Sequence, residues 1–123
     1  MPSTTTISGV EITRYIQSCF KLKAGSTVVW IDPLRVTPAH VGNDKADLVL
    51  ITHPHADHLS VKALAACRKE DAPVVASPAA AESLDRKRIH ATTLWEGQST
   101  TAANLSITAI PGSAFFDSAE SFA

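Results

Sequence analysis

Two short runs of β-branched and large apolar residues constrain the fold most, because each is apolar at nearly every position. They are Thr27-Val28-Val29-Trp30-Ile31 and Leu48-Val49-Leu50-Ile51-Thr52. A strand with one face in water alternates apolar and polar residues, whereas a run without alternation is typical of a buried strand. The sequence therefore predicts two buried central strands, and the first should end where Asp32-Pro33 interrupts the ladder.

Shorter apolar runs predict further strands around this pair: Val10–Tyr15, Ile16–Leu22, Pro73–Ala76, Ile89–Trp95 and Asn104–Ile110. The polar connection over residues 23–26 contains a glycine and predicts a hairpin into the first central strand. Glu96-Gly97 predicts a turn between the last two strands. Together these strands predict a layer of the α/β class.

Two helices are expected between the later strands. Ser60 can cap a helix that begins at Val61, and Ser77-Pro78 is a cap followed by proline that opens a helix over Ala79–Leu84. Residues 33–46 hold two prolines and a glycine and predict a surface loop. Residues 1–9 predict a disordered N-terminal tail.

Length and charge narrow the class of protein. A chain of 123 residues suits one domain, and a hydrophobic fraction of 45% disfavours disorder. The formal net charge of −1 disfavours a basic nucleic-acid binder or a polybasic membrane binder. No apolar run approaches the ~20 residues that cross a bilayer, and the first residues lack the pattern of a secretory signal. The expected location is the cytoplasm.

The two cysteines, Cys19 and Cys67, have neither paired spacing nor a neighbouring histidine. In a chain without a secretory signal, such cysteines are typical of buried free thiols. We therefore expect no disulfide and no thiol nucleophile.

Three of the five histidines fall within six residues, in Thr52-His53-Pro54-His55-Ala56-Asp57-His58. With this composition, chance produces such a pattern in roughly one in two thousand chains of this length. Alternate residues of an extended segment point the same way, so His53 and His55 can converge on one ion. Asp57 and His58 follow where the chain turns toward a helix, and they can hold a second ion. The competing interpretation is a polar loop with solvated histidines, but strand exits of α/β sheets favour a ligand site.

The segment Asp47–Ser60, DLVLITHPHADHLS, resembles the metal-binding signature of the metallo-β-lactamase superfamily. The closest likeness is to its branch of small metal-dependent hydrolases similar to ascorbate-6-phosphate lactonase. The likeness continues in order on both sides of the motif: Val10–Thr13, Ser18–Leu22, Val28–Pro33, Val74–Pro78 and Leu105–Pro111. It therefore extends from Val10 to Pro111, and the histidine motif is its most specific part.

The resemblance implies a fold and an activity. The fold would be α/β, the N-terminal half of a four-layer αββα sandwich, with a mixed sheet and helices on one face over residues 10–123. The activity would be that of a metal-dependent hydrolase, in which a metal-activated water attacks a small ester, lactone or phosphoester. The implied cofactors are two divalent ions, zinc or manganese.

The resemblance also implies a role for each residue of the motif. His53 and His55 would bind the first ion, and Asp57 and His58 the second. Asp57 would also orient the attacking water, which makes it the candidate catalytic residue. Thr52 and Asp32 would hydrogen-bond a ligand imidazole and set its tautomer, although strand-end capping or turn chemistry explains these two residues equally well.

The sequence departs from the family after Pro111, where a third histidine is expected. Residues 112–118 read Gly-Ser-Ala-Phe-Phe-Asp-Ser and no histidine follows, whereas a catalytic zinc normally has three protein ligands. Asp117 is a conceivable substitute without support from its surroundings. His40 and His90 are expected to be structural or solvated.

Two functions therefore remain open: an active hydrolase of a small-molecule substrate, and a truncated, catalytically incompetent metal-binding fragment or dimerising half-domain. One half of a sandwich would expose an apolar sheet face, so a homo-oligomer that covers it is an expected assembly. A nuclease is disfavoured because the net charge is close to neutral and no stripe of basic and aromatic residues is present. Neither a nucleic acid nor a membrane is an expected partner.

Overall fold

The computed structural model describes residues 3–15, 19–33, 36–52 and 61–110. Its strands are β1 (Ser3–Ile7), β2 (Val10–Arg14), β3 (Phe20–Ala24), β4 (Thr27–Ile31), β5 (Leu48–Ile51), β6 (Val74–Ala76), β7 (Thr92–Thr93), β8 (Ser99–Ala102) and β9 (Leu105–Thr108). Its helices are α1 (Pro38–Val41), α2 (Val61–Cys67) and α3 (Pro78–Arg86). Among these described helices, none has the length and apolar character needed to cross a bilayer.

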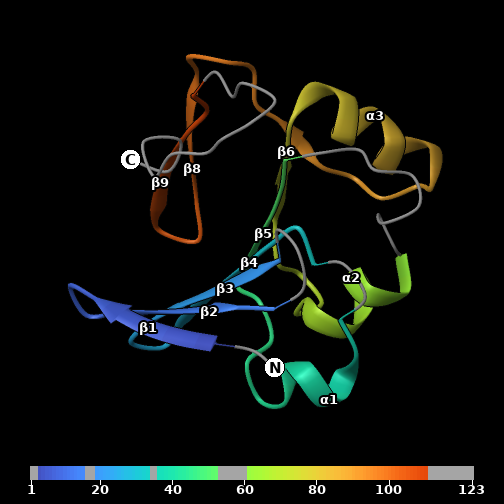
Figure 1. Ribbon diagram of the computed structural model, residues 1–123. Helices are drawn as coiled ribbons and strands as arrows, with labels where there is room; N and C mark the ends of the chain where they lie inside the picture. The colour runs from blue at the N-terminus through green and yellow to red at the C-terminus, as the bar shows by residue number, and fades with distance from the viewer. Residues whose placement is uncertain (1–2, 16–18, 34–35, 53–60, 111–123) are drawn as a thin grey trace.

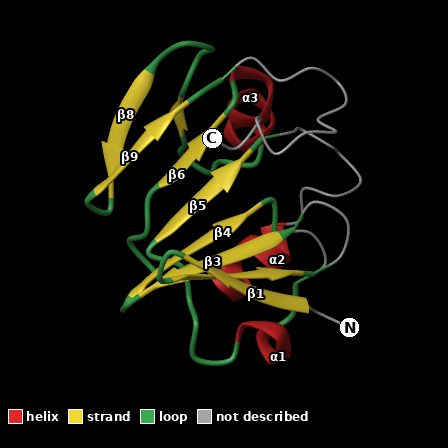
Figure 2. Cartoon of the chain, turned by 60° about the vertical axis from the view of Figure 1, so that its left-hand side comes forward, coloured by secondary structure: helices red, strands yellow, loops and turns green. Residues whose placement is uncertain are grey.

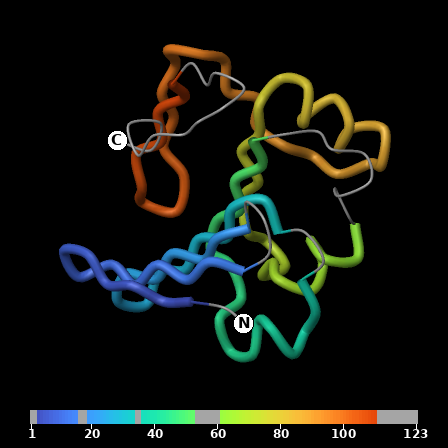
Figure 3. Tube along the Cα trace, in the orientation of Figure 1, coloured from blue at the N-terminus to red at the C-terminus, as the bar shows by residue number. Residues whose placement is uncertain are grey.

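The first seven strands form one mixed sheet in the order β1-β2-β3-β4-β5-β6-β7 (Figure 1). Strands β1 to β4 are antiparallel neighbours, and β4 to β7 run parallel to one another. Figure 3 traces the chain from β6 through α3 into β7, which is the kind of crossover that parallel neighbours require. A separate antiparallel pair, β8 and β9, follows. The predicted mixed α/β sheet is confirmed.

The three helices lie on one face of the main sheet, and the β8–β9 hairpin lies on the other (Figure 2). Side chains alternate across the sheet, so adjacent residues of one strand enter different cores. Trp30 points to the helical side and is fully buried, whereas Val29 packs toward the hairpin. This double burial explains why the two central runs are apolar at nearly every position, and both predicted central strands are confirmed as β4 and β5.

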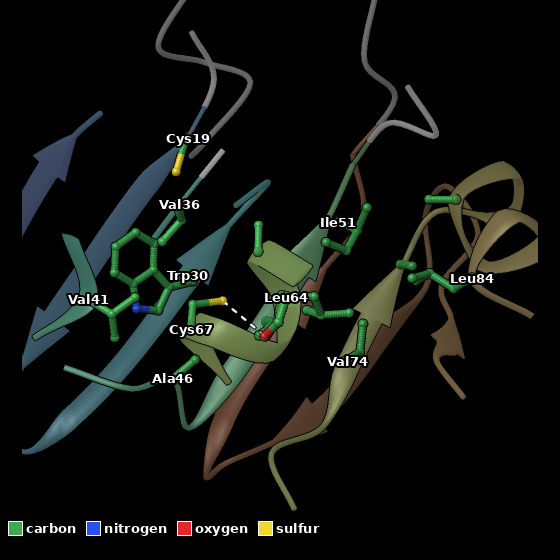
Figure 4. Close-up of a cluster of buried hydrophobic side chains, with 14 of the residues drawn as sticks. Cys19, Trp30, Val36, Val41, Ala46, Ile51, Leu64, Cys67, Val74 and Leu84 are labelled. Atoms are coloured by element: carbon green, nitrogen blue, oxygen red, sulfur yellow. Dashed lines mark hydrogen bonds between the residues drawn. The ribbon is translucent and has the colours of Figure 1, made fainter. Parts of the chain in front are cut away.

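The core on the helical side contains both cysteines (Figure 4). Cys19 and Cys67 are free and fully buried, as predicted. Burial raises the pKa of the Cys67 thiol to about 12, with a smaller contribution from Cys19. The Cys67 thiol donates to the carbonyl of Leu64, 3.6 Å away, so it acts as a small apolar core residue with one weak hydrogen bond.

The amino ends of the central strands are held by two aspartates. The Asp47 carboxylate accepts a 2.8 Å hydrogen bond from the Val28 N–H and forms an ion pair with the Lys69 ammonium. Asp44 accepts from the ammonium groups of Lys21 and Lys23 at 2.8 and 3.0 Å. These contacts join segments that are 19 to 23 residues apart in sequence, at the end of the sheet opposite the histidine motif.

The expectation of a disordered tail over residues 1–9 is wrong for its described part. Ser3–Ile7 form β1, which pairs with β2 along its whole length. The strand contains three consecutive threonines, which favour extended structure, and the hairpin turns at Ser8-Gly9, where both residues have positive φ.

The final hairpin also differs from the prediction. The hairpin turns at Ala103-Asn104, with φ of 51° and 63°. The predicted turn at Glu96-Gly97 is present, but it leads from β7 into β8 and does not join the two strands of the hairpin. Within the predicted strand over Ile89–Trp95, only the two residues of β7 form a strand. The other residues of that segment form the connections before and after it. Gly97 instead connects the two sheets, and its N–H donates to the carbonyl of Ala109 at 2.7 Å.

The predicted surface loop over residues 33–46 contains helix α1. Thr37 caps this helix, Pro38 occupies its first turn, and the side chains of Thr37 and His40 form a reciprocal capping box. Val36 and Val41 are buried in the helical-side core. Four helical residues are too few for apolar periodicity to be visible, although the Thr-Pro cap signal was present in the sequence.

Candidate metal centre

The histidine motif follows directly after β5 and precedes α2. His53, His55, Asp57 and His58 lie outside the described residues, as does Asp117. Thr52, immediately before the motif, and Asp32, at the end of β4, are described. The motif therefore begins at the carboxyl edge of parallel strands, which is where ligand sites form in open α/β sheets.

Asp32 and Thr52 are bound to each other by two hydrogen bonds. The Thr52 N–H donates to Asp32 Oδ1 at 2.7 Å, and the Thr52 hydroxyl donates to Oδ2 at 2.5 Å. Asp32 lies at the carboxyl edge of the sheet, directly after β4, and only 5% of the residue is exposed. Charge-assisted hydrogen bonds of this kind are short and roughly twice as strong as neutral ones, so the pair fixes the residue that precedes the motif.

The backbone at Asp32 has an unusual conformation that makes this contact geometrically accessible. Its φ is 47°, in the left-handed region, where aspartate and asparagine are tolerated better than most side chains. Its N–H donates to the carbonyl of Leu50 at 2.9 Å, which continues the parallel ladder one step beyond β4. The turn at Asp32 therefore directs its carboxylate across to the neighbouring strand end.

The next strand along is tied to the same edge. The N–H of Ser77, just after β6, donates to the carbonyl of Ile51 at 3.1 Å. The Ser77 hydroxyl accepts from the Ala80 N–H at 3.3 Å and so caps α3, as predicted. The carboxyl ends of β4, β5 and β6 are thus held in register around the point where the motif starts. The Ser-Pro signal predicted the helix cap but not this hydrogen bond from the Ser77 main chain to the neighbouring strand.

The donor chemistry of the motif fits a divalent metal ion. Three imidazoles and a carboxylate are ligands that zinc accepts, and manganese also accepts carboxylate. In the described ranges no group of three or more histidine, cysteine, aspartate or glutamate side chains gathers elsewhere. The metal-binding candidate of the chain is therefore identified by the donor set that its sequence provides.

The remaining histidines have other surroundings. His40 Nδ1 accepts from the Thr37 N–H at 3.1 Å inside the α1 capping box, which confirms its structural role. His90 lies exposed between α3 and β7. The predicted hydrogen bonds from Thr52 or Asp32 to a ligand imidazole stay predictions, because the ligands lie outside the described residues.

Comparison with protein families gives one match that covers most of the chain. The model described as "Beta-lactamase superfamily domain" matches residues 11–120. The matched region includes the histidine motif and every described element from β3 to β9.

Individual relatives agree with the family match. An Oenococcus oeni protein named as a metal-dependent hydrolase is 40% identical over 53 residues, which are 40% of this chain and 23% of that protein. An Asterias rubens cytidine monophosphate-N-acetylneuraminic acid hydroxylase is 28% identical over 78 residues, 51% of this chain and 12% of that protein.

A solved structure shares the fold. The crystal structure of a Parabacteroides distasonis protein, provisionally described as a metal-dependent hydrolase, superposes with a TM-score of 0.66 and 27% identity. The match covers 90% of this chain and 50% of that one. The chain thus spans half the length of this solved relative and smaller shares of the two sequence relatives.

Proposed function

Because this chain belongs to the beta-lactamase superfamily, we propose that it carries the metal-binding half of a metal-dependent hydrolase. The observation that carries this proposal is that Thr52, the residue directly before the motif, is held at the carboxyl edge of the sheet by Asp32. The names of the Oenococcus oeni and Parabacteroides distasonis relatives support it, since both describe metal-dependent hydrolases.

The motif residues divide between two divalent ions in this proposal. His53 and His55 bind the first ion, and Asp57 and His58 bind the second. When bound, such ions supply Lewis acidity that lowers the pKa of a water molecule toward ~7. Asp57 additionally accepts a hydrogen bond from the attacking water and orients it. Zinc and manganese are the proposed metals, because both accept this donor set.

Asp32 and Thr52 act as positioning residues. Their two hydrogen bonds fix the main chain at residue 52, and the imidazole of His53 is attached to the next residue along. A ligand held in place before the metal binds loses less conformational entropy on binding, so the pair favours metal affinity without touching the substrate.

The proposed substrate class is a small ester, lactone or phosphoester. Attack by an activated water on a carbonyl or phosphoryl centre is the chemistry that a divalent metal site of this kind performs. The near-neutral charge of the chain supports a small molecule over a polyanionic polymer.

We further propose that the fold is half of an αββα sandwich. On β1 to β3, the face shared with the hairpin carries Ile7, Ile12, Phe20 and Leu22, none of which is fully buried. Ile7 is 58% exposed. These residues lie on the same side as the buried Val29, which supports a second apolar layer there. That layer comes from the remaining length of a hydrolase domain or from a second copy of the chain.

A second candidate function is metal binding without hydrolysis. It is favoured by one observation, that residues 112–118, where the resemblance places a third histidine ligand of the first ion, contain no histidine. In this case the chain binds metal weakly and associates through its apolar sheet face as a dimerising half-domain.

The deciding experiment measures metal content and hydrolysis in the same preparations. We expect about two equivalents of zinc or manganese to remain after dialysis, with hydrolysis of nitrophenyl ester or phosphoester probes. His55→Ala should lose the metal and the hydrolysis, whereas His90→Ala, an exposed histidine outside the motif, should retain both. Metal that dialyses away without effect would exclude the proposed enzyme. Retained metal without hydrolysis would favour the second candidate, and its concentration-dependent association is measurable by sedimentation.

A further inference from the structure

A groove of about 530 Å³ begins at the carboxyl edge of the main sheet and runs along α3. Pro78 and Ala79 line it at the start of the helix, and Trp95 lines it just after β7. We call this end of the groove the Trp95 subsite. The opposite end, lined by Asp85 and His90, lies toward the amino end of β7 and is not part of the subsite.

Two main-chain hydrogen bonds connect the Trp95 subsite to the strand that precedes the histidine motif. The N–H of Leu94 donates to the carbonyl of Ala76 at 2.9 Å, and the N–H of Ser77 donates to the carbonyl of Ile51 at 3.1 Å. They join the carboxyl ends of β7, β6 and β5 in that order. Neighbouring strands are ~4.8 Å apart, so the ends of β5 and β7 lie about 10 Å apart across the sheet. A small molecule that reacts at the motif can therefore reach the subsite.

The ring of Trp95 is presented to solvent from a main chain that is held in place. Its N–H donates to Gln98 Oε1 at 3.1 Å, and its carbonyl accepts from the Gln98 N–H at 3.0 Å. The residue is nevertheless 59% exposed, whereas the other tryptophan, Trp30, is fully buried. An aromatic ring that is already positioned loses little entropy when a flat apolar group packs against it.

The surroundings of the Trp95 subsite favour an uncharged group. Ala81, which packs in the helical-side core, also lines the groove. Glu82 is paired with Arg86 at 2.6 Å, and three basic residues directly follow Asp85 in the sequence. The acidic side chains of the groove are therefore balanced by basic neighbours, and apolar contact with the exposed indole is the interaction that the subsite offers.

We propose that the Trp95 subsite binds an uncharged aromatic group of the substrate whose ester, lactone or phosphoester bond reacts at the metal centre. This inference rests on the proposed function. The ring of Trp95 packs against the aromatic group, and a flexible linker spans the ends of β6 and β7 to the reacting bond. Trp95 is then a specificity-determining residue, and the substrate class narrows to arylalkyl compounds.

The test compares methyl ω-phenylhexanoate with methyl hexanoate on the zinc-loaded chain, and uses the two corresponding acids as ligands that do not react. We expect a KM about tenfold lower for the phenyl ester and about tenfold tighter binding of the phenyl acid in calorimetry. Trp95→Ala should reduce both preferences to about twofold, and Trp95→Phe should keep most of each. Ile7→Ala is the matched control, because Ile7 is 58% exposed at the opposite edge of the main sheet, and it should leave both preferences unchanged.

The readouts separate this inference from the proposed function. Retained zinc without hydrolysis of either ester would refute the proposed function, and binding of the two acids would still decide the subsite. Equal binding of the two acids, or a phenyl preference that survives Trp95→Ala, would overturn the inference while ester hydrolysis stands. An affinity for the phenyl acid that chelation of the zinc leaves unchanged would also overturn it, because the groove would then bind the ring independently of the metal centre.

Discussion

Thr52 donates two hydrogen bonds to the carboxylate of Asp32, one from its main-chain nitrogen and one from its hydroxyl. The contact joins the carboxyl ends of β5 and β4 across 20 residues of sequence. It uses both oxygens of one buried carboxylate to hold the residue that precedes the histidine motif.

Replacement of Asp32 by asparagine should lower the free energy of unfolding by ~1–3 kcal/mol, because one acceptor oxygen becomes an amide that faces a donor. Asparagine tolerates the left-handed backbone, so this variant isolates the lost acceptor. Asp32→Ala should cost a further ~1 kcal/mol, because alanine is strained at that φ. Urea unfolding measures all three proteins. Asp71→Asn, an exposed control, should change stability by less than ~0.5 kcal/mol, and an equally stable Asp32→Asn would contradict the role of the pair.

Zinc should raise the melting temperature of the chain and a chelator should reverse the increase. At a free concentration one hundred times its dissociation constant, a ligand that binds only the folded state adds ~2.7 kcal/mol to the free energy of unfolding. This corresponds to a rise in melting temperature of roughly 10 °C for a domain of this size. His55→Ala should abolish most of the shift, and His90→Ala should keep it. Equal shifts for the parent and His55→Ala would place the bound zinc elsewhere. Differential scanning fluorimetry provides the measurement.

Acid should weaken the amino-end contacts of the sheet. The Lys69 ammonium, together with the Val28 N–H, holds the pKa of the Asp47 carboxyl below its usual range. A carboxyl group whose pKa is lowered in the folded state stabilises the fold at pH values above the ordinary aspartate pKa near 4. That contribution is lost as the pH falls through the lowered pKa. The stability difference between the parent and Asp47→Asn should therefore be present at pH 7 and shrink below about pH 4. A difference that stays constant across this range in urea titrations would show that the charge of Asp47 is not involved.

Neither cysteine should react with a thiol reagent in the folded protein at neutral pH. Cys19 and Cys67 are fully buried, and burial raises the pKa of Cys67 to about 12, so almost no thiolate is present. Reaction with an aromatic disulfide reagent should proceed at the rate of unfolding and become rapid and complete in urea. Fast labelling of either thiol without denaturant would show that the helical-side core opens locally.

The central part of the fold could be predicted from the sequence because burial on both faces leaves a continuous apolar pattern. Strands β4 and β5 follow that pattern, and the Ser77-Pro78 signal correctly placed the start of α3. These elements depend on local chemistry that one sequence displays.

The elements that were missed depend on information that is not local. Strand β1 is threonine-rich and exposed, so its extended form depends on pairing with β2 rather than on an apolar face. In the final hairpin, Ala103 adopts positive φ without the glycine that normally marks such a turn. For the site, the motif was visible in the sequence, but the pairing of Asp32 with Thr52 was not, because it requires the register of β4 and β5.

The β8–β9 hairpin has a different kind of attachment from every other strand. Among the described residues its strand hydrogen bonds are internal, and it meets the main sheet through apolar side chains such as Leu105 and Ile107. It can therefore separate from the sheet without breaking any strand-to-strand hydrogen bond of the larger sheet. Such a unit opens on its own at a lower free energy than the whole domain. The hairpin is consequently the part of the described chain where exchange of amide hydrogens with solvent should reveal motion first.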